Sequence, residues 1–322
     1  MLSYFNPAKM FENHRVGIIG IGGAGDIASA YVICKVLKDF FGVSFCIPIA
    51  VLWERSIIDP IAGPPPKSLI KGAKISECVY FSSESYVDRG LYRYRPQASI
   101  LASIMNDVVP AITLEYGVQG YRKCLDELIS NYSVDCFVGL DVGGDILADG
   151  WEDCLGSPLT DAIGLAALSS FNSVIAVLAP GADGELPQEY VLSKISDLAK
   201  LNGYIGSIGL WSNYLSYIED VVSKFETEAS KIPIIALKGF EGIKSIRGGL
   251  RKVKVNIVST ILFILNTKTL YRRSRLALNL TSTKNLAEAI KKAEELNIIT
   301  EFHSELRRMM ASFANKAYKP QQ

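Results

Sequence analysis

Short apolar stretches alternate along the chain with longer segments whose apolar side chains recur every three or four positions. The first pattern is typical of strands buried on both faces of a sheet, and the second of helices with one buried side. We expect strands at residues 15–20, 43–52, 77–82, 111–116, 134–140, 174–179, 204–209 and 276–280. We expect helices at residues 26–41, 97–106, 121–131, 159–170, 188–201, 211–230 and 283–297.

Two segments allow more than one interpretation. The apolar residues 253–265 fit either a buried helix or a strand. Tyrosine and arginine alternate along residues 92–95, which fits an ordinary amphipathic strand or a surface on which a base stacks.

Strands that are separated by helices predict a mostly parallel sheet with helices on both faces. The predicted fold class is therefore α/β, with a Rossmann-like, doubly wound arrangement. No shift in composition marks a domain boundary, so we expect a single domain over residues 1–322. Within it, the part from about residue 247 is a candidate C-terminal helical extension.

Composition excludes several classes of protein. The chain has 322 residues and is 49% hydrophobic, which excludes general disorder. Its formal net charge of +1 creates no global field for nucleic acid or anionic membranes, and we assign the basic residues 247–254 to a solvated helix face. No apolar run is long enough to span a bilayer, and residues 1–15 lack the apolar core of a secretory signal. We therefore expect a cytoplasmic protein with no nucleic-acid or membrane partner.

The six cysteines form no metal-binding or redox motif, because no two of them are spaced C-x-x-C. The chain has only two histidines, His14 and His303, which disfavours a zinc site or a Ser-His-Asp site. We expect buried thiols and leave open a disulfide of the kind that hyperthermophile proteins keep inside cells. The cysteines are Cys34, Cys46, Cys78, Cys124, Cys136 and Cys154.

Polar or glycine-rich turns follow four of the expected strands, and two of these turns combine glycines with aspartates. In a parallel sheet the carboxyl ends of all these strands lie at one edge, where ligands bind. Asp26, Asp141 and Asp145 should therefore lie close together in space. The four turns are residues 20–26, 53–59, 141–153 and 181–185.

The first turn, residues 20–25, matches the G-x-G-x-x-G spacing of a dinucleotide-binding turn. The backbone amides of Gly22, Gly23 and Gly25 would then approach an anionic ligand at the start of a helix. Asp26 would repel a phosphate there unless a metal ion lies between them. Three interpretations stay open: a dinucleotide, another phosphorylated or carboxylated ligand, and a structural turn in which Asp26 caps the helix.

The second turn places Asp141 and Asp145 on either side of the pair Gly143 and Gly144. Carboxylates that are held close together need a cation or a shared proton. A magnesium ion bridging to a phosphate would make Asp141 and Asp145 metal ligands. The alternatives are that these aspartates cap helices, or that one of them acts as a general acid or base.

Two other turns add Glu54, Arg55 and Asp183 as candidate ligand-binding residues. Glu54 is the nearest candidate for the acid that a dinucleotide site requires after its glycine turn. The planar guanidinium of Arg55 could clamp a carboxylate or a phosphate. The alternative for Arg55 is a surface ion pair with Glu54 or Asp59.

On these motifs the chain resembles the archaeal family catalogued as domain of unknown function 1152. The likeness extends from about Val16 to about Asn297, and family members usually carry a further glycine where Ala24 stands here. The family has no established activity, so the resemblance implies the fold and the place of the site but no reaction. The motifs are Gly22 to Asp26; Trp53 to Arg55 with Asp59-Pro60 and Gly63-Pro64; and Asp141 to Asp145 with Ser157 to Leu159 and Asp161.

We therefore hypothesise an enzyme that binds a small anionic ligand, phosphorylated or nucleotide-like, at the carboxyl ends of the strands. Asp26, Asp141 and Asp145 are its candidate catalytic residues, and Mg²⁺ is its candidate cofactor. Two alternatives belong to other classes of protein: a non-catalytic sensor that binds a nucleotide, and an assembly protein whose aspartates only cap helices. Each of these is compatible with a homo-oligomer.

Overall fold

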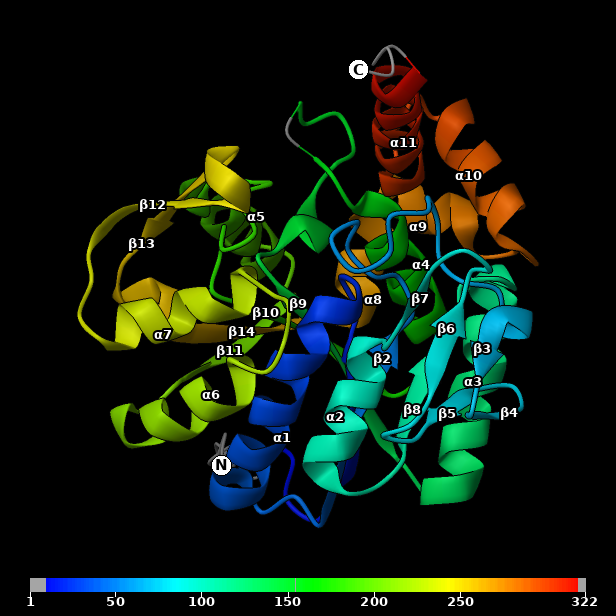
Figure 1. Cartoon of the computed structure of the whole chain (residues 1–322). Coiled ribbons are helices and arrows are strands. Elements are labelled where there is room, and N and C mark those ends of the chain that lie inside the picture. Colours follow the sequence, from blue (N-terminus) through cyan, green and yellow to red (C-terminus); the bar gives the residue numbers. More distant parts are fainter. Residues whose placement is uncertain (1–9, 154, 318–322) are drawn as a thin grey trace, which may run out of the picture.

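A nine-stranded sheet forms the centre of the computed structural model, which describes residues 10–153 and 155–317 (Figure 1). The strands from β10 to β8 pair in parallel, and both edges of the sheet are antiparallel. In sheet order the strands are β11 (Tyr204–Gly209), β14 (Ile261–Asn266), β10 (Ser173–Leu178), β9 (Cys136–Val142), β1 (Arg15–Gly20), β2 (Phe45–Val51), β8 (Val109–Ile112), β5 (Val79–Phe81) and β4 (Lys74–Ile75). The predicted α/β class with a mostly parallel sheet is confirmed.

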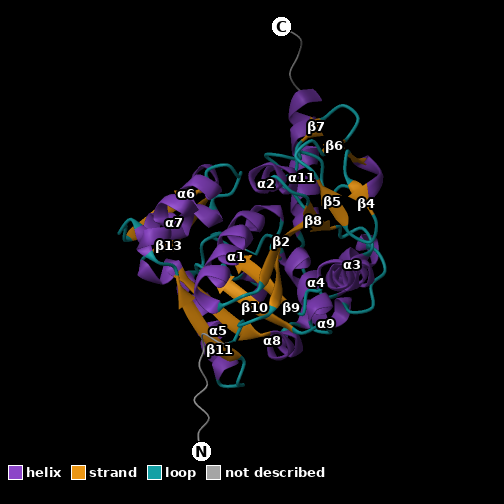
Figure 2. Ribbon diagram, turned by 90° about the horizontal axis from the view of Figure 1, so that it is seen from below, coloured by secondary structure: helices purple, strands orange, loops and turns teal. Residues whose placement is uncertain are grey.

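Helices cover both faces of this sheet, because alternate side chains of its central strands enter two separate apolar cores (Figure 2). Ile18 and Val138 belong to one core, and Ile19 and Phe137 to the other. The first core contains α1 (Ile27–Phe41), α2 (Gln97–Met105), α6 (Leu215–Val222) and α7 (Ile232–Leu237). The second contains α3 (Gly117–Tyr132), α4 (Pro158–Leu168), α5 (Gln188–Ala199), α8 (Thr267–Arg273), α9 (Arg275–Leu280) and α10 (Leu286–Glu295).

Three smaller parts complete the described chain. β3 (Ile70–Lys71), β6 (Tyr86–Asp88) and β7 (Arg93–Tyr94) form a small sheet, and the tyrosine-arginine segment contributes one short strand, β7. β12 (Gly242–Ile246) and β13 (Arg251–Val255) form a hairpin, and α11 (Glu301–Ala317) ends the described chain. None of the described helices combines the length and the apolar character that crossing a membrane requires.

The structure corrects several predicted elements. The strand predicted at 276–280 is wrong, because these residues form α9: Ser274 Oγ accepts a hydrogen bond from the amide of Ala277 (3.2 Å) and caps it. The helix predicted at 211–230 ends at Val222, and α7 follows a separate turn. Residues 253–265 form neither one helix nor one strand, because a short helix at 257–260 divides them. From residue 247 the chain forms two strands, β13 and β14, each preceded by a short 3-10 helix, and its α-helices begin at Thr267.

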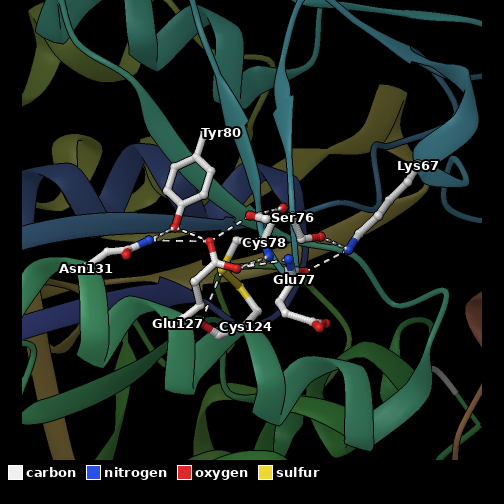
Figure 3. Close-up of a disulfide and its surroundings, with 8 residues drawn as sticks. All are labelled: Lys67, Ser76, Glu77, Cys78, Tyr80, Cys124, Glu127 and Asn131. Atoms are coloured by element: carbon white, nitrogen blue, oxygen red, sulfur yellow. Dashed lines mark hydrogen bonds between the residues drawn. A yellow bond between two sulfur atoms is a disulfide. The ribbon is translucent and has the colours of Figure 1, made fainter.

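Four of the cysteines form disulfides, so the expectation of free buried thiols is wrong for them. Cys34 of α1 bonds to Cys46 of β2, and Cys78 bonds to Cys124 of α3. Cys136 is a buried free thiol, and Cys154 lies outside the described residues. Figure 3 shows the second disulfide beside Glu127, which accepts hydrogen bonds from Ser76 Oγ (2.7 Å), Glu77 N (2.9 Å) and Tyr80 Oη (2.6 Å).

Removing the two disulfides should have unequal effects on stability. The Cys78–Cys124 bond spans 46 residues and the Cys34–Cys46 bond spans 12. Loop-closure entropy therefore predicts a loss of about 4 kcal/mol for the first and about 3 kcal/mol for the second when both cysteines of a pair are replaced by alanine. Urea unfolding of the two double variants measures the difference. A larger loss for the Cys34–Cys46 pair would contradict this expectation.

Candidate functional site

The candidate site lies where the order of the parallel strands reverses. β2 and β8 lie on one side of β1, and β9 and β10 lie on the other (Figure 1). In open α/β sheets, ligands bind beyond the carboxyl ends of the strands at such a point. The glycine turns that follow β1 and β9 meet there, since Val142 N donates a hydrogen bond to Asp26 Oδ2 (3.3 Å).

Three carboxylates converge on Gly22 in the first of these turns. A Cβ atom at Gly22 would lie 2.8 Å from Asp26 Oδ2, 3.4 Å from Asp161 Oδ1 and 3.7 Å from Asp141 Oδ1. These side chains come from the start of α1, from the first turn of α4 and from the end of β9. All three are buried. The absence of a side chain at Gly22 thus makes room for a cluster of acids.

Asp145 connects this group to a second set of acids. Oxygen atoms of Asp141, Asp145 and Asp161 all lie within 4.8 Å of one another, and so do those of Asp145, Asp183 and Glu185. The predicted juxtaposition of Asp26, Asp141 and Asp145 is therefore found in the structure, together with Asp183. We call the six side chains the acidic cluster: Asp26, Asp141, Asp145, Asp161, Asp183 and Glu185.

Backbone amides of the turn that follows β9 stabilise the negative charge of Asp141. Asp141 accepts hydrogen bonds from the amides of Gly144 (3.2 Å) and Ile146 (3.0 Å). The Gly143 amide donates to Leu178 O (3.0 Å), so both glycine amides are used within the protein. Gly143 has φ 136°, and a Cβ there would lie 2.4 Å from Asp183 Cγ. Gly143 and Gly144 therefore allow the carboxylates of Asp183 and Asp141 to lie close to the backbone.

Asp161 differs from the other members of the cluster. It is 1% exposed, and neither of its carboxylate oxygens has a hydrogen-bond partner in the described part of the chain. It does not cap α4, because Glu301 accepts the amides of Leu159 (3.0 Å) and Thr160 (2.7 Å). An ionised carboxylate buried without partners costs several kcal/mol unless a proton or a cation neutralises it.

Burial is the largest cause of the raised pKa values in the cluster, and repulsion between neighbouring carboxylates adds to it. The pKa is raised well above the ordinary range for Asp26, Asp145 and Asp161, to about 6 for Asp141 and to about 7 for Asp183. Glu185 is the exception. Burial alone would raise its pKa, but the Arg251 guanidinium and several hydrogen bonds outweigh burial and lower it.

Two arginines border the cluster on the side of Glu185. Arg251 Nη1 donates to Glu185 Oε1 (2.8 Å) and to the carbonyl oxygen of Asp183 (3.2 Å). Arg247 Nη2 lies 3.8 Å from the same glutamate oxygen. Burial and the nearby guanidiniums of Arg251 and Arg55 lower the pKa of Arg247. Glu185 is thus neutralised within the protein, whereas the aspartates are not.

The first turn uses its remaining glycines mainly for packing. A Cβ at Gly25 would lie 3.4 Å from Thr227 Oγ1, and Gly23, at φ 126°, lies close to Trp53 O. Asp26 stands at the start of α1 without a capping hydrogen bond from its side chain. The structural interpretation of Asp26 as a helix cap therefore does not hold.

Glu54 and Arg55 lie outside both groups of acids. Glu54 is buried, accepts the Gln97 amide (2.8 Å) and has its pKa raised to about 7, chiefly by burial. Arg55 pairs with Glu228 (3.1 Å) rather than with Glu54 or Asp59. The third aspartate of the second turn, Asp149, forms an ion pair with Lys194 and takes no part in the cluster.

Sequence reasoning did not select four residues of this site. Asp161 lies within an apolar helical run, where it gives no local signal, although it belongs to the motif that carried the family resemblance. Glu185 lies in a turn that was expected at the site, but its role depends on Arg251. The basic pattern of residues 247–254 predicts a solvated helix face, which is wrong for Arg247 and Arg251, because the hairpin carries both of them to the cluster.

An all-oxygen set of buried carboxylates suits a hard divalent cation such as Mg²⁺, Mn²⁺ or Ca²⁺. The two histidines are engaged elsewhere, His14 with Asp135 and His303 with Glu294. The cluster therefore offers the ligand chemistry that was expected for magnesium, with Asp161 as an additional ligand candidate.

Comparisons with known proteins identify the family of the chain but no activity. Neither the curated proteins nor the solved structures give a significant match. One family model, described as a protein of unknown function (DUF1152), matches residues 18–309. Since this match covers most of the 322 residues, the chain belongs to the DUF1152 family.

Proposed function

We propose that this protein is a divalent-metal-dependent enzyme that acts on a small anionic ligand. A Mg²⁺ or Mn²⁺ ion would be held by Asp141, Asp145 and Asp161. The observation that carries the proposal is the carboxylate of Asp161, which is buried without a partner among the described residues and lies beside two other buried carboxylates.

Charge balance supports a cation at this place. The acidic cluster holds six carboxylates, and within the described residues only Arg251 and Arg247 form ion pairs with any of them, both through Glu185. A divalent ion would replace the protons that otherwise keep these groups neutral. We assign the ion to the group with Asp161 because both oxygens of Glu185 already accept hydrogen bonds.

The topology supports the same location. The parallel strands follow the order β8-β2-β1-β9-β10, which is the 3-2-1-4-5 order of a Rossmann-like, doubly wound sheet. The cluster lies at the switch point of that order. We therefore infer that the sheet has a Rossmann-like, doubly wound arrangement.

The bound cation would polarise an oxygen of the ligand or of a water molecule. Asp26 lies outside both metal-binding groups, yet its carboxylate approaches those of Asp141 and Asp161 beside Gly22. A carboxyl group with a raised pKa in that position suits the transfer of a proton to or from the ligand. We assign Asp26 this role.

Titration with Mn²⁺ tests the proposal. The wild-type protein should bind Mn²⁺, and Asp161→Asn should weaken the affinity at least tenfold, because the substitution removes a ligand from the ion. Asp149→Asn is the matched control, since it alters an aspartate of the neighbouring turn that pairs with Lys194. No binding by the wild type, or equal affinity in Asp161→Asn, would overturn the proposal.

Turnover separates the enzyme from a sensor. Phosphate esters and nucleotides are screened by thermal shift with and without Mg²⁺, and each hit is then assayed for conversion. Conversion that requires Mg²⁺ supports the enzyme. A metal-dependent shift without conversion would identify the protein as a sensor.

A further inference from the structure

Three arginines from distant segments approach one another beside the acidic cluster. Arg55 follows β2, Arg247 lies in the tip of the hairpin, and Arg251 begins β13. Arg55 Nη2 donates to Glu228 Oε2 (3.1 Å), and the other oxygen of Glu228 accepts the amide of Arg247 (2.9 Å). The guanidinium of Arg247 in turn approaches Glu185, which also binds Arg251. We call Arg55, Arg247 and Arg251 the arginine group.

Most hydrogen-bond donors of the arginine group are unused within the described chain. A guanidinium offers five N–H donors, but Arg55 makes one hydrogen bond through its guanidinium and Arg247 makes none. The side chains are 30%, 32% and 21% exposed for Arg55, Arg247 and Arg251. Glu185 and Glu228 offset part of the positive charge of the three guanidiniums, and an anionic ligand would balance the remainder.

The backbone at Arg247 turns through a left-handed conformation at the tip of the hairpin. Arg247 has φ 53°, a left-handed conformation that costs a non-glycine residue about 1 kcal/mol or more. The two residues that follow are glycines, which adopt the same region without this cost. The turn at the tip of the hairpin thus brings Arg247 beside both Glu185 and Glu228.

We propose that the arginine group binds a phosphoryl group of the ligand, on the side of the metal site where Glu185 lies. The proposal rests on the proposed function, which it deepens by naming a phosphate ester as the substrate class. A phosphate carries nearly two negative charges and three acceptor oxygens, whereas a carboxylate carries one charge and two oxygens. Three guanidiniums match the phosphate better.

Calorimetric titration with inorganic phosphate tests the arginine group. Phosphate should bind to the Mn²⁺-loaded protein, and Arg247→Asn should weaken this binding at least tenfold with no change in Mn²⁺ affinity. Asparagine tolerates the left-handed conformation, so the melting temperature should not fall. Lys252→Gln is the matched control, because it removes one positive charge from an exposed position on the same hairpin.

The possible outcomes separate this inference from the proposed function. Normal Mn²⁺ binding with a phosphate affinity that Arg247→Asn leaves unchanged would overturn the inference alone. Phosphate binding that depends on Arg247 in a protein that binds no Mn²⁺ would support the inference and overturn the metal site. Malonate binding as tightly as phosphate, or no phosphate binding with or without Mn²⁺, would overturn the phosphoryl assignment.

Discussion

Replacing Asp145 with asparagine should strongly weaken the binding of divalent metal and, at about pH 8, raise the melting temperature of the metal-free protein. Asp145 is the one residue shared by both groups of acids. Its loss should weaken Mn²⁺ binding at least a hundredfold, more than the loss of Asp161, because an amide oxygen is a poorer ligand than a shared carboxylate.

The expected gain in stability has an electrostatic cause. Asp145 is buried, and its pKa is raised first by burial and then by four neighbouring carboxylates. In the metal-free protein at a pH well above the ordinary pKa of an aspartate, the raised pKa of Asp145 destabilises the folded state. Asparagine has the same shape without the charge and can still accept the hydrogen bond of Ser157 Oγ (3.0 Å). We expect an increase of a few degrees, measured by calorimetry in the presence of a chelator.

Asp149→Asn gives the contrasting result in the same segment. Its carboxylate forms a partly buried ion pair with Lys194, so its loss should lower the melting temperature and leave the Mn²⁺ affinity unchanged. If Asp145→Asn bound Mn²⁺ normally or melted below the wild type, the cluster would be an ordinary structural network.

The metal-free protein should lose stability as the pH rises from about 5 to about 8, and saturating Mg²⁺ should remove much of that loss. The pKa of Asp141 is about 6 and that of Asp183 about 7 in the folded state, both above the ordinary value of 3.8. At a pH between 3.8 and these raised pKa values, the folded state binds more protons than the unfolded chain. The stabilisation from these groups is therefore complete below about pH 4 and is lost as the pH rises through 6 to 7.

Metal binding should stabilise the folded protein more strongly as the pH rises. A cation displaces these protons, so its affinity rises with pH until the carboxylates are ionised. Glu54 and Glu301 also have pKa values raised to about 7 by burial, and they lie outside both metal-binding groups. Part of the loss of folding stability between pH 5 and pH 8 should therefore persist in Mg²⁺. Urea unfolding at several pH values, with chelator and with Mg²⁺, measures both effects. Metal-free stability that rises between pH 5 and pH 8 would contradict the account.

The central parallel strands were predictable because each is a short, nearly continuous apolar run between amphipathic segments. β1 and β9 are examples, buried on both faces and followed by glycines. Strand order and the antiparallel edges were not predictable, since they depend on pairings between distant segments such as β10 and β14. The pairing of the cysteines was not predictable for the same reason, because spacing alone does not show which cysteines meet.

The acids of the candidate site were predictable where they directly follow a strand. Asp26, Asp145 and Asp183 lie in such turns and Asp141 lies at the end of β9, and the topology brings these strand ends together. Asp161 was not selected because a single acid in the first turn of an apolar helix has the same local pattern as an ordinary solvated residue. The arginine group depends on a hairpin that is remote in sequence, so only the tertiary structure places it beside the cluster.

Anomalous diffraction from crystals grown with Mn²⁺ tests the central claim most directly. The account predicts an anomalous peak about 2.0–2.2 Å from carboxylate oxygens of Asp141, Asp145 and Asp161. Crystals at saturating Mn²⁺ and about pH 8 that show no peak at these three aspartates would contradict it. Protons rather than a cation would then balance the buried charge.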